Sequence, residues 1–250
     1  MGNPLSSFAI VKLVEIKSDL LNLSVSITNN SFYLILSVLL LMVLFIQSNN
    51  ILGSKLVPSN LALVGETLHA SLLSMARQTV GNQAMLPLLL ALFGIILMAN
   101  LLSNIPYNYA STSALTITLG LSLTVFIGVT SLAISIKKWV YLATFVPAGT
   151  PNALLPLLVL IELVSYCARA ISLGVRLFAN IVAGHTLLNI ISTMSNKIMT
   201  SSILGALIVI IPVALLIALV GLEIAVAFIQ AYVFVILTAI YLDEAIKPLV

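Results

Sequence analysis

Long apolar runs separated by short polar stretches set the pattern of this chain. Three of them cover residues 32–47, 85–103 and 114–136, and each is continuous rather than alternating. An apolar run of about 20 residues can cross the hydrocarbon layer of a bilayer as a helix. Strands of a membrane barrel would show short alternating segments instead. We therefore predict an all-α integral membrane protein with these three runs as spanning helices.

Two further apolar stretches, residues 153–195 and 203–246, are too long for upright spans. Each would form a helix of about 65 Å, whereas the hydrocarbon layer is about 30 Å thick. Either each stretch breaks into two spans, or both helices lie strongly tilted. The only prolines inside them, Pro156 and Pro212, lie near their starts. We therefore predict a two-helix hairpin inclined about 25–30° from the membrane plane.

Residues 59–79 have a different pattern, with Glu66, His69 and Arg77 among leucines at helical spacing. This pattern favours an amphipathic helix at the membrane surface. We expect these six segments to form a single membrane domain over residues 1–250.

The positions of the lysines indicate how the chain is oriented in the membrane. Lys55, Lys137 and Lys138 fall on one side of the membrane if the three spans alternate. The positive-inside rule assigns that side to the cytoplasm or matrix, so the N-terminus is expected on the opposite side.

Composition narrows the class of protein. Hydrophobic residues make up 61% of the chain and charged residues 7%, whereas a soluble domain is about one quarter charged. No basic cluster indicates nucleic-acid binding, and no Gly-rich loop indicates a nucleotide site. A single cysteine, Cys167, excludes an internal disulfide and a multi-cysteine metal site. We expect no cofactor and no bound metal.

Charged residues form a stripe on the first long helix. Glu162, Arg169 and Arg176 are spaced by seven, and Asn180 follows four residues later, so all four share one helical face. One charge in the middle of a membrane costs about 2.5–3.5 kcal/mol. The stripe must therefore face water, a partner charge, or both. Glu162 and Arg169 can form a structural ion pair, but Arg176 has no second acid on its own helix.

The second long helix repeats this spacing with Glu223 and Gln230, and it ends near two further acids, Asp243 and Glu244. His185 lies half a turn around the first helix from Arg176. It is either a packed core histidine or a partner of Glu223, and we expect the second. Glu223 can alternatively pair with Arg176 across the hairpin.

Small residues line both long helices, among them Ala168, Gly174, Ala179, Ala183, Gly184, Ala218, Gly221, Ala225 and Ala231. Small residues allow helices to approach closely. They can pack the hairpin on itself, or present a smooth face to another helical protein.

Residues 172–185, SLGVRLFANIVAGH, resemble the most characteristic segment of subunit a of proton-translocating ATP synthases. Residues 221–242, GLEIAVAFIQAYVFVILTAIYL, are similar to the family's final helix, and residues 145–177 and 100–110 extend the resemblance. It is strongest to mitochondrial forms. In this family the subunit is the stator of a rotary proton motor and lies against a ring of c subunits, each with one buried carboxylate.

The resemblance implies a role for each polar residue. Arg176 would face the rotor carboxylate. Glu223, His185, Asn180 and Gln230 would line a half-channel from the intermembrane side, and Glu162 would serve the matrix half-channel, with Arg169, Asp243 and Glu244 as further candidates. Arginine keeps its proton and so acts as a fixed charge, whereas Glu and His exchange protons near neutral pH.

The resemblance also implies that ATP chemistry takes place in other subunits and that this chain is not itself an enzyme. Its expected partners are the c-ring, the peripheral stalk, other membrane-sector subunits, protons and the lipid bilayer. We expect the chain to cross the mitochondrial inner membrane several times, with its N-terminus on the intermembrane-space side. The alternatives are a secondary transporter, which would show an internal repeat and broken helices, and a structural subunit of another membrane complex. The second alternative leaves the charged stripe unexplained.

Overall fold

The computed structural model describes residues 9–18, 23–52, 60–79, 85–105, 108–138, 141, 154–201 and 209–246. Its long helices are α1 (Asn29–Leu52), α2 (Asn60–Thr79), α3 (Leu86–Ser103), α4 (Leu115–Lys137), α5 (Leu155–Ser201) and α7 (Ile210–Ile246). A short 3-10 helix, η3 (Ser111–Ser113), precedes α4. Among the described residues, every long helix except α2 is long and apolar enough to cross a membrane.

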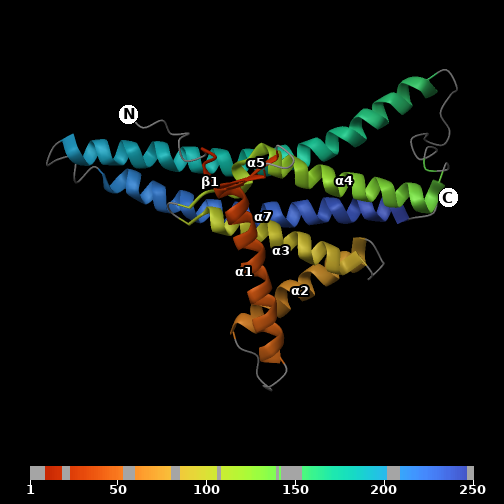
Figure 1. Ribbon diagram of the computed structural model, residues 1–250, viewed down its shortest axis with the longest axis horizontal. Helices are drawn as coiled ribbons and strands as arrows, with labels where there is room; N and C mark the ends of the chain where they lie inside the picture. Colours follow the sequence, from red (N-terminus) through yellow and green to blue (C-terminus); the bar gives the residue numbers. More distant parts are fainter. Residues whose placement is uncertain are drawn as a thin grey trace.

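α5 and α7 are unbroken helices of 47 and 37 residues, about 70 and 55 Å long at 1.5 Å per residue. Pro156 and Pro212 lie in their first turns, where a helix tolerates proline. The alternative of two broken stretches is therefore wrong for the described residues. Figure 1 shows α5 and α7 side by side, with α1 running across their common direction. The inclination of α5 and α7 to the membrane plane stays a prediction.

Helix ends differ from the predicted ones in α1 and α5. α1 covers Asn29–Leu52 rather than residues 32–47, so it extends beyond the predicted span at both ends. α5 continues to Ser201 rather than ending at 195, because residues 196–201 contain no Gly or Pro to stop it. α7 begins at Ile210, after a turn at Val209. The predicted start at 203 lies outside the described residues, as do the starts at 59 and 153.

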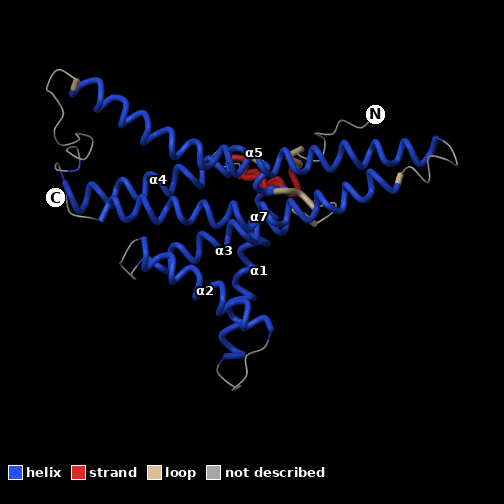
Figure 2. The backbone as a smooth tube through the Cα atoms, turned by 180° about the vertical axis from the view of Figure 1, so that it is seen from behind, coloured by secondary structure: helices blue, strands red, loops and turns tan. Residues whose placement is uncertain are grey.

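Two short strands, β1 (Lys12–Ser18) and β2 (Leu23–Thr28), form an antiparallel pair that the all-α prediction missed. The apolar and polar residues of β2 alternate, as LSVSIT, and such alternation is typical of a strand. Asn29 ties this sheet to the start of α1. Its side chain accepts a hydrogen bond from the Val11 amide at 3.2 Å and donates one to the Ala9 carbonyl at 3.1 Å. Figure 2 shows how small the sheet is beside the helices.

α2 is amphipathic, as predicted. Leu72, Met75 and Ala76 are buried, on the face that packs against the neighbouring helices α1, α3 and α7. Glu66, His69 and Arg77 are exposed. Its place at the membrane surface stays a prediction.

The core is formed mainly by α3 and α7. Leu89 and Ile96 of α3 are almost fully buried, and Phe234 and Val235 of α7 are fully buried. α3 packs against α1, α2 and α7, whereas α4 packs against α5 and α7. This core holds α7 in place and presents its polar residues to α5.

Candidate functional site

Polar side chains of α5 and α7 meet in pairs across the interface between these antiparallel helices. His185 Nε2 lies 3.7 Å from Glu223 Oε1, and the Asn180 amide donates a hydrogen bond to Gln230 Oε1 at 2.9 Å. The prediction that His185 pairs with Glu223 is confirmed. The alternative pairing of Glu223 with Arg176 is not what the structure shows.

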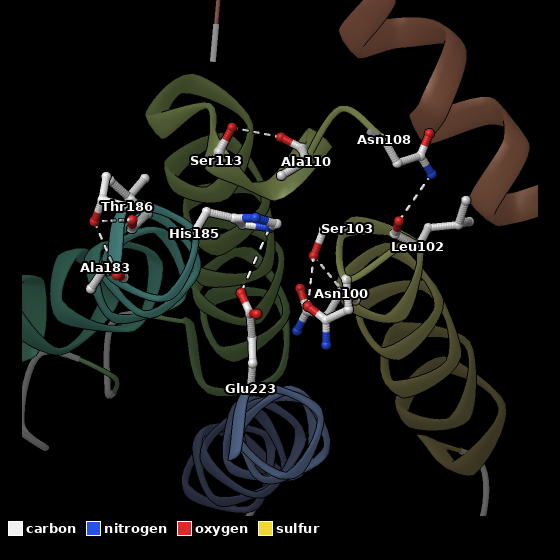
Figure 3. Close-up of polar contacts among 12 residues, drawn as sticks. Asn100, Leu102, Ser103, Asn108, Ala110, Ser113, Ala183, His185, Thr186 and Glu223 are labelled. Carbon is white, nitrogen blue, oxygen red and sulfur yellow. Dashed lines mark hydrogen bonds and ion pairs between the residues drawn. The ribbon is translucent and has the colours of Figure 1, made fainter. Parts of the chain in front are cut away.

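The His185–Glu223 pair is shielded from bulk solvent, with side-chain exposures of 20% and 7% (Figure 3). Its 3.7 Å separation is longer than a hydrogen bond, but it suits an ion pair or a contact through one water molecule. Gln230 is also buried, at 4% exposure. Buried ionisable pairs add little net stability, so this pair is better explained by chemistry than by folding.

Gly184 makes room for the Glu223 carboxylate. A Cβ atom at Gly184 would lie 2.8 Å from Glu223 Oε1 and 3.2 Å from its Cδ. Such a contact is too short, and the end of the glutamate side chain would have to shift. The absence of a side chain at position 184 therefore lets the carboxylate lie against α5 beside His185.

If His185 and Glu223 pass protons, as the family resemblance implies, Gly184→Ala is expected to slow ATP-driven proton pumping about tenfold, because displacing a reacting group by about 1 Å can cost up to about 100-fold. Alanine in a helix is more stable than glycine by roughly 0.5–1 kcal/mol, so the helix itself does not weaken. The control is Gly128→Ala on α4, where an added Cβ meets no atom within 4 Å. Equal pumping by the two variants would show that the close approach of Gly184 to Glu223 has no functional consequence.

A second polar cluster lies toward the other end of the α5–α7 interface. Arg169 contacts Glu162 at 3.2 Å and Glu244 at 3.9 Å. Lys137 Nζ donates to the backbone carbonyl of Glu244 at 2.6 Å. The Arg169, Glu162 and Glu244 side chains are 37%, 43% and 54% exposed, and exposed pairs of this kind contribute little to stability. Glu162 and Arg169 thus form the ion pair considered from the sequence, and Glu244 extends it to α7.

α4 supports α5 both at the second cluster and between the two clusters. The hydroxyls of Thr130 and Tyr166 lie 3.0 Å apart, and the Tyr166 ring packs against Phe126 with centroids 4.8 Å apart. A Cβ at Gly174 would lie 2.6 Å from Ser122 Oγ, so α4 and α5 approach closely there. This contact fixes which face of α5 points away from α4.

Arg176 lies on that outward face of α5. It is exposed, as are Ser172, Ala179 and Ala183 within two turns of it. Within the described part of the chain, Arg176 makes no hydrogen bond or ion pair to another side chain. The small neighbours leave the guanidinium accessible to a partner that approaches this face. The small residues predicted from the sequence therefore divide between two faces, because Ala170 and Gly174 are buried against the protein.

An apolar layer separates the two polar clusters at the level of Arg176. Leu173 and Leu177 of α5 are 2% and 1% exposed, and Phe234 and Val235 of α7 are fully buried. All four belong to one hydrophobic cluster. The layer thus places packed apolar side chains of both helices between the two clusters.

The sequence-predicted residues thus fall into two groups around Arg176. One group is His185, Glu223, Asn180 and Gln230, and the other is Glu162, Arg169 and Glu244. Asp243 lies half-buried near the end of α7. Sequence reasoning missed Gly184 and Lys137 as members of these groups. Their contacts with Glu223 and Glu244 depend on helix packing, which residue spacing along one helix does not reveal.

The chain is similar in sequence to a known family of proteins. The sequence model of the family described as "ATP synthase A chain" matches residues 31–243. The chain belongs to this family. It is 41% identical to "ATP synthase subunit a" of Mycosarcoma maydis over 247 residues, covering 98% of this chain and 96% of the relative. It is 42% identical to the protein of that name in Podospora anserina, covering 98% and 94%. It is 39% identical to that in Chondrus crispus, covering 98% and 96%.

As a member of the ATP synthase A chain family, this chain is a membrane-sector subunit of the rotary ATP synthase and works in a complex with other subunits. This membership decides against a separate secondary transporter or a structural subunit of an unrelated complex. Its helical, strongly apolar architecture fits a protein that crosses the membrane several times.

Proposed function

We propose that this chain conducts protons through two offset half-channels to and from a ring of rotor subunits, and that Arg176 faces the rotor carboxylates. The observation that carries the proposal is the order of features along α5. Two polar clusters lie on either side of an exposed arginine, and a packed apolar layer lies between them. A proton that enters one cluster must therefore leave on the rotor to reach the other.

Arg176 supplies the fixed charge. An arginine keeps its proton at any physiological pH, so it does not relay protons itself. Its positive charge favours the ionised form of a rotor carboxylate as it passes between the half-channels. The exposed face around Arg176, lined by Ser172, Ala179 and Ala183, suits close contact with a helix of the rotor.

His185 and Glu223 serve the half-channel on the intermembrane side, with Asn180 and Gln230 nearer Arg176. Carboxylate and imidazole groups can accept and release protons near neutral pH when their surroundings permit. Glu162 serves the matrix half-channel, with Arg169 and Glu244 beside it and Asp243 close by. Each proton that crosses 100 mV releases about 2.3 kcal/mol, which drives rotation.

The proposal places the chain in the mitochondrial inner membrane with its N-terminus toward the intermembrane space. Its partners there are the c-ring, the peripheral stalk and other membrane-sector subunits. ATP synthesis takes place in other subunits, so the chain is a non-catalytic part of the enzyme complex. A resident cofactor, a metal and nucleic acid play no part in this proposal.

The proposal is tested by purifying the complex through a tag on this chain. We expect a small apolar subunit in many copies, with one carboxyl group that a carbodiimide modifies. Modification of that group should stop ATP-driven proton pumping by the purified complex in vesicles. A complex that pumps protons but contains no such multicopy subunit would overturn the proposal.

A further inference from the structure

The last turn of α7 carries two acidic residues at the end of a helix where acids are unfavourable. Asp243 and Glu244 lie within four residues of Ile246, at which α7 ends. The last four carbonyls of a helix have no partner within it, and with the helix dipole they make this end negative. Basic residues stabilise such an end, but α7 has none in its last turn. Lys247, the next residue in the sequence, lies outside the described residues.

A lysine of another helix supplies positive charge at this end of α7. Lys137 is the last residue of α4, and its Nζ atom donates a hydrogen bond to the backbone carbonyl of Glu244 at 2.6 Å. Figure 1 shows the ends of α4 and α7 side by side. This carbonyl is one of the four that α7 leaves without a partner of its own. The ammonium group therefore both satisfies the carbonyl and offsets the negative charge of the helix end.

The two adjacent lysines at the end of α4 differ in position. Lys137 is half-buried, whereas Lys138 is exposed. Lys138 has a φ of 50°, a backbone conformation that few residues other than glycine adopt, and α4 ends there. α4 itself is held on α5 by the contact between Thr130 and Tyr166, and it also packs against α7. Lys137 thus extends from a helix that is fixed relative to both of its neighbours.

The position of the Glu244 backbone determines where its carboxylate lies. Glu244 Oε2 is 3.9 Å from Arg169 Nη1, and an ion pair between partly exposed side chains contributes little to stability. That pair alone is therefore too weak to hold the end of α7 against α5. The contact from Lys137 is much shorter and involves a charged donor, and such hydrogen bonds are the stronger ones.

We propose that Lys137 is a positioning residue of the matrix half-channel, and that it holds the end of α7 so that the Glu244 carboxylate stays beside Arg169 and Glu162. The inference rests on the proposed function and adds α4 to the helices that build this half-channel. It also explains why α7 ends on two acids. Proteins break local rules at functional sites and compensate elsewhere, and here the compensating charge comes from α4.

The test measures ATP-driven proton pumping per assembled complex, with the complete complex in vesicles. Lys137→Met keeps the long apolar part of the side chain but removes its charge and its N–H donors. We expect pumping to slow about tenfold, the factor that corresponds to one lost hydrogen bond to a charged group, because Glu244 then spends less time in place. Lys137→Arg keeps a charged donor and should restore most of the rate. The control is Lys138→Met, which removes the adjacent exposed lysine and should pump normally.

A double variant separates the positioning of Glu244 from a general role in packing. Glu244→Gln alone should also slow pumping about tenfold. In that background Lys137→Met should slow pumping less than about twofold further, because the carboxylate that Lys137 positions is already gone. A merely structural lysine would lower the rate by the same factor in both backgrounds.

Several results would overturn this inference: equal factors in the two backgrounds, normal pumping by Lys137→Met or by Glu244→Gln, no rescue by Lys137→Arg, or loss of the assembled complex in Lys137→Met. Arg176→Ala distinguishes a failure of this inference from a failure of the proposed function. If Arg176→Ala pumps normally, the proposed function itself fails. If Arg176→Ala does not pump but Lys137→Met does, only the role of Lys137 is refuted.

Discussion

Arg176→Ala is expected to abolish proton-driven ATP synthesis while the complex still assembles. Arg176 is exposed and makes no hydrogen bond or ion pair with another described side chain. Its removal therefore leaves no buried partner unpaired and should change the stability of the fold little. The rotor carboxylate would lose the positive charge that favours its ionised form. The measurement is growth on a respiratory substrate, together with the amount of assembled complex.

Arg176→Lys is expected to be severely impaired as well. A lysine can lose its proton in a poorly solvated site, whereas an arginine does not. The matched control is Arg77→Ala on the exposed face of α2, which should grow normally. Normal growth of either Arg176 variant would refute the role assigned to this residue.

Glu223→Gln and His185→Gln are expected to slow proton uptake without making the membrane leaky. Their side chains lie 3.7 Å apart, and they serve one water path in this account. Once one of the two side chains is replaced, the path is already impaired, so replacing the other side chain lowers the rate of proton uptake less. The double variant should therefore lose less activity than the sum of the two single losses, when each loss is expressed as a free energy.

ATP-driven pumping at several pH values provides this comparison. The matched control is Glu66→Gln with His69→Gln, a pair of the same residue types on the exposed face of α2. This pair should have no effect, alone or together. Strictly additive losses at Glu223 and His185, or full pumping by Glu223→Gln, would mean that they belong to separate features.

The helices of this protein could be predicted from sequence because their signals are local. Continuous apolar runs mark α1, α3 and α4, and the prolines near the starts of α5 and α7 break neither helix. The residues at which the helices end were less predictable. Polar residues 196–201 do not stop α5, because polarity alone does not end a helix. The β1–β2 pair was missed because the alternating stretch of β2 is only six residues long and the adjacent apolar residues Leu13 and Val14 break the alternation in β1.

The pairing of His185 with Glu223 was predictable because few ionisable residues exist in these two helices. The contribution of Gly184 was not. Gly184 matters through the distance from its missing Cβ to a carboxylate on another helix. This feature arises only when distant segments pack together.

The most direct test of the account is the side of the membrane from which each polar cluster can be reached. In a Cys167→Ser background, a single cysteine is placed at Thr186, beside His185, or at Ser165, between Glu162 and Arg169 along α5. A membrane-impermeant thiol reagent is then added to one side of vesicles that contain the complete complex. We predict that Thr186→Cys reacts from one side only and Ser165→Cys from the opposite side only. Labelling of both from the same side, or of either from both sides, would contradict two offset half-channels.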